Sequence, residues 1–164
     1  MNILPLEMQR KKIDMEVIYK TEWHAELHMV ETTLSGTVNE QDIEQWEQSL
    51  TQAFARIPDG TYFKIFINLH GFSAATLQAH KRYREIIPLL LANHDWKVGY
   101  VDLFEESKLM KFRKIRNIGC IAAVHVHQDE EKIKKYEENF SRENEHYMTD
   151  PVKAKQWILS YPLN

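Results

Sequence analysis

Three histidines and one aspartate are the side chains of this 164-residue chain that are best placed to do chemistry. His70 follows one expected strand, and Asp102 lies near the end of another. His125 and His127 end a third strand, and their spacing places both on one face of it. Because ligands of open α/β sheets bind beyond the carboxyl ends of the parallel strands, these side chains can share one site if their strands are neighbours. Imidazole with carboxylate suits zinc or another transition metal, and a single histidine suits proton transfer near neutral pH.

A simpler interpretation of these residues is favoured, in which each is a separate polar residue at the end of its strand. A His-x-His spacing alone is a weak motif, so we predict no cofactor and no assigned metal site. His70, His125 and His127 are retained only as the candidates for metal ligands.

A second group, His24, Glu26 and His28, alternates along one expected strand and could present metal ligands on one face. The favoured interpretation is the solvated face of an edge strand, where charged side chains prevent pairing between molecules.

The loop from Gly71 to Thr76 precedes an expected helix. Ser73 or Thr76 can cap that helix, and its free N–H groups can hold a phosphate or carboxylate. The plain cap is the favoured interpretation. A serine nucleophile needs an activating base, which no spacing in the chain supplies, so a hydrolase is not predicted.

A basic segment alternates with apolar residues late in the chain. Leu109, Met110, Phe112 and Ile115 lie between its cations, which are Lys108, Lys111, Arg113, Lys114 and Arg116. Such a segment can contact an anionic membrane or an acidic partner, although a solvated helix with an apolar side in the core is favoured. The acidic stretch from Asp129 to Glu138 could face this segment in another copy, which gives a homodimer hypothesis.

Composition indicates one ordinary globular domain. The chain is 43% hydrophobic and 27% charged, with a net charge of -3 and an isoelectric point near 6.2, so nucleic-acid binding is not expected. A single cysteine, Cys120, fits a reducing compartment, and we expect a cytoplasmic protein without a membrane span. We expect a lead-in at residues 1–13 and a single domain at residues 14–164.

The spacing of apolar residues predicts alternating strands and helices. An alternating strand begins at Val17, with Ser35-Gly36 as its expected end, and Pro88 is expected to kink or divide one helix. The further elements expected are a helix at 39–57, a buried strand at 62–67, a helix at 76–93, a strand at 96–104, a helical basic segment at 105–117, a strand at 118–126, a helix at 129–140, a short strand at 145–148 and a final helix from 151. This order predicts an α/β fold with a mixed, mostly parallel sheet, an antiparallel N-terminal edge hairpin and flanking helices.

Four segments of the chain resemble the STAS domain, and more closely the SpoIIAA-like group described with STAS and SEC14-type folds. They are Leu34–Val38, Ile65–Phe72, Cys120–Val124 and Glu145–Pro151 with Ala154 and Trp157. The resemblance covers about residues 15–160. It implies a single STAS-like, cytosolic module that binds a protein partner or a small ligand. By position it also implies a phosphorylation switch at Ser73 or Thr76, but the Asp-Ser pair typical of switched members is absent.

The leading functional hypothesis is therefore a non-enzymatic STAS-like binding module for a protein partner or a small anionic or lipid-like ligand, with a regulatory role as one form of it. One alternative is a metal- or His-dependent enzyme that uses the candidate residues at the carboxyl ends of the parallel strands. A second alternative is peripheral membrane association through residues 108–116.

Overall fold

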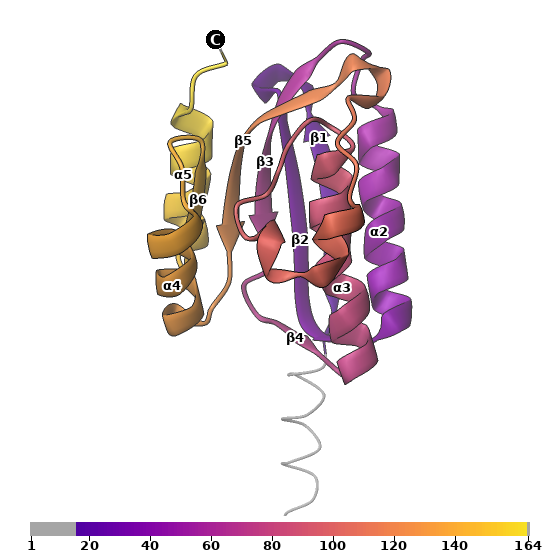
Figure 1. Cartoon of the computed structure of the whole chain (residues 1–164), viewed down its shortest axis with the longest axis vertical. Helices are drawn as coiled ribbons and strands as arrows, with labels where there is room; N and C mark the ends of the chain where they lie inside the picture. The colour runs from indigo at the N-terminus through magenta and orange to yellow at the C-terminus, as the bar shows by residue number, and fades with distance from the viewer. Residues whose placement is uncertain (1–15, 164) are drawn as a thin grey trace, which may run out of the picture.

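The computed structural model of the chain describes residues 16–163, so the lead-in expected at residues 1–13 lies outside the described residues. These residues form one mixed sheet flanked by helices (Figure 1). The strands are β1 (Ile18–His24), β2 (Met29–Val38), β3 (Tyr62–Asn68), β4 (Phe72–Ala74), β5 (Gly119–Val126) and β6 (Glu145–Met148). The helices are α2 (Glu40–Ala55), α3 (Leu77–Ala92), α4 (Glu130–Phe140) and α5 (Pro151–Ser160).

The sheet has the strand order β1-β2-β3-β5-β6, with the short β4 continuing beside the end of β2. β1 pairs antiparallel with β2, and β2, β3, β5 and β6 are parallel. The predicted α/β fold with a mostly parallel sheet and an antiparallel N-terminal edge is therefore confirmed. Ile67 is aligned with His125, and His125 with Tyr147, so the carboxyl ends of three parallel strands meet at one edge.

The core has two parts, one on each face of the sheet. The larger part lies under α2 and α3 and includes Trp46, Ile65 and Ile67. The smaller part lies under α5, where Ala154 and Ile158 pack on β3 and β5. Figure 1 shows α2 and α3 side by side on one side of the strands and α5 on the other. β3 is buried along its interior, as expected for a strand covered on both faces.

Side-chain caps fix where the helices begin. Asn39 accepts a hydrogen bond from the N–H of Asp42 (2.8 Å), and Asp42 accepts one from the N–H of Asn39 (3.0 Å), which forms a capping box. Each of the other three described helices begins after a capping side chain, namely Thr76, Asp129 and Asp150. The predicted helices at 39–57, 76–93, 129–140 and from 151 are confirmed, with ends shifted by a few residues.

The first expected strand is divided by a turn. Residues Ala25–Leu27 form a 3-10 turn and His28 has a φ of 49°, so β1 ends at His24 and the chain reverses into β2. The apolar alternation continues through this turn, so it does not mark where the expected hairpin reverses. His24, Glu26 and His28 therefore do not share a strand face, and the metal set suggested for them is wrong.

Gly36 lies inside β2 and does not end the strand, contrary to expectation. Its φ of +92° is in the left-handed region, and a Cβ there would lie 2.0 Å from the carbonyl oxygen of Glu16. Glycine is needed here because the backbone passes this close to another segment.

The strand expected at 96–104 is wrong. Trp96, Val98 and Val101 are buried as the pattern suggests, but they lie in a covering segment (residues 94–118) that has a 3-10 turn at Val101–Leu103. β5 occupies the position beside β3, so this segment packs on the larger core and not in the sheet.

The helix expected at 105–117 is also wrong. The basic segment forms short 3-10 turns at Glu105–Leu109 and Ile115–Asn117. By contrast, α3 is one helix from Leu77 to Ala92 with Pro88 inside it, so the proline does not divide the helix.

Candidate ligand-binding cavity

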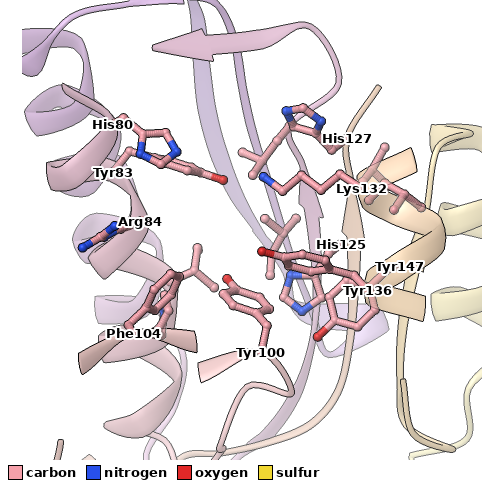
Figure 2. Close-up of a pocket in the computed structure, with 16 residues that line it drawn as sticks. His80, Tyr83, Arg84, Tyr100, Phe104, His125, His127, Lys132, Tyr136 and Tyr147 are labelled. Carbon is pink, nitrogen blue, oxygen red and sulfur yellow. The ribbon is translucent and has the colours of Figure 1, made fainter. Parts of the chain in front are cut away.

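A cavity of about 120 Å³ lies at the carboxyl ends of β3 and β5. Its walls come from α3, α4, β6 and the covering segment around residues 100–104, as Figure 2 shows. Apolar side chains, among them Ile67, Ile87 and Phe104, line part of it, and tyrosines and histidines line the rest. Its place matches the general position of ligand sites in open α/β sheets.

The structure brings only two of the four chemical candidates into this cavity. His125 and His127 both line it. His70 is exposed in the loop after β3, and Asp102 forms a 3.4 Å ion pair with Lys97 and has 76% of its side chain exposed. Among residues 16–163, no group of three or more His, Cys, Asp or Glu side chains is arranged to hold a metal ion.

His125 is held by a buried carboxylate that the sequence analysis did not identify. Its Nε2 lies 2.8 Å from Oε2 of Glu145, whose side chain is 0% exposed. The other carboxylate oxygen accepts hydrogen bonds from Nη2 of Arg142 (2.5 Å) and from the N–H of Gly99 (3.0 Å). The ring of His125 also stacks on Tyr147, with centroids 4.7 Å apart and planes 11° apart. This imidazole is therefore fixed in place by contacts on its edge and its face.

Burial alone would raise the pKa of the Glu145 carboxyl. The hydrogen bonds and charges of His125 and Arg142 outweigh burial and hold that pKa below its ordinary value of 4.5. Glu145 is therefore ionised at neutral pH, and Arg142 provides the opposite charge.

Four tyrosines form much of the polar wall. Tyr83, Tyr100 and Tyr136 extend from α3, the covering segment and α4, and Figure 2 shows their hydroxyls directed toward the space between these elements. Burial raises the pKa of Tyr83, Tyr100, Tyr136 and Tyr147 above the ordinary value of 10.0. All four hydroxyls therefore stay protonated and can donate hydrogen bonds at physiological pH.

Lys132 is the cation that reaches farthest into the cavity. Figure 2 shows its ammonium extending from α4 toward the tyrosine hydroxyls, and its Nζ lies 5.6 Å from the centroid of the Tyr136 ring. Burial lowers the pKa of Lys132, although the charge of Asp129 opposes this. No described carboxylate forms an ion pair with Lys132, whereas Arg84, the other cation at the wall, is paired with Glu106 at 3.2 Å.

His127 and His80 lie at the same wall. Burial lowers the pKa of both imidazoles, and the charge of Lys132 acts in the same direction, so both are neutral at pH 7. Nδ1 of His127 accepts a hydrogen bond from the backbone N–H of Asp129 (3.1 Å). Its Nε2 therefore carries the proton and can donate. His80 had no distinguishing sequence signal, since it lies within an ordinary helical pattern.

Ser73 and Thr76 do not line this cavity. Ser73 is exposed in β4, and the hydroxyl of Thr76 accepts a hydrogen bond from the N–H of Ala79 (3.0 Å) as the cap of α3. The cap is confirmed, and the phosphorylation switch at either residue stays a prediction.

The basic segment is exposed, but its cations differ in role. Arg116 pairs with Asp59 (2.6 Å) and donates to the carbonyls of Phe54 and Ile57, so it holds the end of α2. Lys114 lies 4.7 Å over the ring of Tyr62. Lys108, Lys111 and Arg113 are exposed and form no ion pair with a described carboxylate. Membrane contact and dimer formation through this segment stay predictions.

Comparison with known proteins does not identify the chain: no protein-family model, curated protein or solved structure matches it. Every helix within residues 16–163 is too short or too polar to cross a membrane.

Proposed function

We propose that this protein is a binding module for a small organic anion, held in the cavity between α3 and α4. The observation that carries the proposal is the unpaired ammonium of Lys132 inside a cavity whose wall contains no carboxylate. A half-buried cation without an ion-pair partner is partly desolvated, and an anionic ligand offsets that cost.

The donors at the wall match a carboxylate group. Lys132, the protonated hydroxyls of Tyr83, Tyr100 and Tyr136, and Nε2 of His127 all offer hydrogens. Charge-assisted hydrogen bonds of this kind are stronger than neutral ones, particularly where water is partly excluded.

The size and the apolar part of the cavity restrict the rest of the ligand. At about 120 Å³, the cavity is smaller than the roughly 300–1,000 Å³ of pockets for drug-sized ligands, so it restricts the ligand to a small molecule. Ile67, Ile87 and Phe104 provide an apolar surface for a ring or a short alkyl chain. Benzoate and phenylacetate have the appropriate size and charge.

The experiment is isothermal titration of the full chain with phenylacetate and with its neutral analogue phenylacetamide. Phenylacetate should bind more tightly than phenylacetamide. Lys132→Met should lower the affinity for phenylacetate about 10- to 100-fold, as expected for a charged hydrogen bond worth roughly 1.5–3 kcal/mol. Lys134→Met, on the exposed side of α4, is the matched control and should leave binding unchanged. Absence of binding at millimolar acid, or equal affinity in Lys132→Met, would overturn the proposal.

The STAS-like assignment belongs to the same proposal. It is supported by the antiparallel β1–β2 edge followed by parallel strands with helices between them, which is the element order of the resemblance. A protein partner that responds to occupancy of the cavity would make this module regulatory.

A second candidate function is a His-dependent enzyme that uses the same cavity. The specific observation in its favour is the His125–Glu145 hydrogen bond, since a base oriented by a buried carboxylate is a common catalytic arrangement. Deuterium exchange into a bound acid in heavy water, abolished by His125→Phe, would favour this function over simple binding.

A further inference from the structure

The tautomer of His125 follows from its hydrogen bond to Glu145. Glu145 carries one negative charge, and Arg142 already supplies the opposite charge to the same carboxylate. Because the Glu145 carboxylate can only accept, Nε2 of a neutral His125 must carry the proton.

In the neutral imidazole, the second nitrogen of His125 is then an acceptor. Nδ1 forms no hydrogen bond with any residue in the range 16–163, and Figure 2 shows the ring at the cavity wall beside Tyr100, whose centroid is 5.6 Å away. Stacking on Tyr147 and the bond to Glu145 prevent the ring from turning this edge elsewhere. The cavity therefore combines several donors with one oriented ring acceptor.

We infer that the ligand is a carboxylic acid that also carries a hydroxyl or N–H group, which donates to Nδ1 of His125 while the carboxylate meets Lys132. This inference rests on the proposed binding of a small organic anion and names its chemical class. An acid without a donor would bury Nδ1 unpaired, and that penalty selects the hydroxy or amino acid over its apolar counterpart.

The experiment compares matched pairs of acids on the full wild-type chain by isothermal titration at pH 8, above the ordinary pKa of histidine. The ortho, meta and para isomers of hydroxyphenylacetate are each paired with the methylphenylacetate of the same substitution. The pairs match in size and charge and differ in the donor. At least one hydroxy isomer should bind about tenfold more tightly than its methyl partner, the usual effect of one buried hydrogen bond.

Two variants assign that preference to one residue. His125→Phe keeps a ring against Tyr147 and removes the acceptor, so it should abolish the hydroxyl preference. His127→Phe is the matched control and should leave the ratio between the paired acids intact, because His127 contributes a donor. Circular dichroism checks that each variant folds, and if His125→Phe does not fold, the wild-type comparison decides.

The outcomes separate this inference from the proposed function. If methyl and hydroxy acids bind equally, or if the preference persists in His125→Phe, the inference is overturned and anion binding stands. If no acid of either series binds, the proposed function fails together with the inference.

Discussion

Replacing Glu145 with glutamine tests the arrangement that holds His125. The side chain is 0% exposed, and its carboxylate accepts hydrogen bonds from His125, Arg142 and the N–H of Gly99. A glutamine amide has one acceptor oxygen and two donor hydrogens. With the proton of His125 on Nε2, at least one of the three surrounding donors would therefore face another donor.

The size of the effect follows from burial. Removing one partner of a buried charge pair costs about 3–5 kcal/mol. Arg142 keeps 43% of its side chain exposed, so water can solvate its guanidinium after the substitution. We therefore expect Glu145→Gln to lose about 3 kcal/mol of unfolding free energy, or roughly 6–12 °C in Tm at this chain length.

The pH dependence has a defined sign. Since the folded-state pKa of Glu145 lies below 4.5, its stabilising contribution is complete at neutral pH and is lost as pH falls through that lowered pKa. The stability gap between wild type and Glu145→Gln should be widest at neutral pH and should narrow below about pH 4.

Urea unfolding followed by tryptophan fluorescence and circular dichroism measures both quantities. Glu138→Gln, an exposed carboxylate on α4, is the matched control and should change stability by less than about 0.5 kcal/mol. The reasoning is refuted if Glu145→Gln stays within that same margin at pH 7, or if its gap from wild type widens on acidification.

Three further changes test other parts of the structure. Gly99→Ala should lose about 1–3 kcal/mol of unfolding free energy in urea, because its Cβ would lie 2.4 Å from a backbone carbonyl oxygen. Gly119→Ala should lose less, because its Cβ first meets the flexible end of a lysine, and equal losses in the two variants would contradict this account. Thr76→Ala should lose about 1 kcal/mol of unfolding free energy through the missing cap of α3, whereas Thr76→Ser should stay close to wild type. An unchanged urea midpoint in Thr76→Ala would show that the cap contributes nothing. Burial lowers the pKa of Lys132 below its ordinary value of 10.5, so affinity for phenylacetate should fall with rising pH before exposed lysines titrate. Constant affinity up to the pH at which exposed lysines titrate would argue against Lys132 as the anion's partner.

Local sequence signals predicted most of the fold. The caps at Asn39 and Thr76 and the apolar run of β5 depend on neighbouring residues alone, and each of these predictions is confirmed. The errors arose where an apolar pattern did not reveal its packing partner. Trp96 and Val98 are buried as a strand would be, but they cover the core because β5 occupies the place beside β3.

The cavity was only partly predictable. His125 and His127 were found because strand ends in α/β sheets indicate ligand sites. Glu145 was missed because one carboxylate in a short strand has no local signature, and only the pairing of β6 with β5 brings it to His125. Lys132 has no distinguishing sequence signal, since the sequence does not show that α4 places this residue beside α3.

The covering segment has a consequence for the speed of binding. From residue 94 to residue 118 the chain contains 3-10 turns and an isolated bridge, yet it forms one wall of the cavity. Segments with few ladder hydrogen bonds open at lower free energy than the sheet beneath them. We therefore expect association to be limited by opening of this wall and to be slower than diffusion allows. Substitutions in this segment at residues other than the lining residues Tyr100 and Phe104 should then change the association rate constant while leaving the equilibrium contacts of the bound ligand intact.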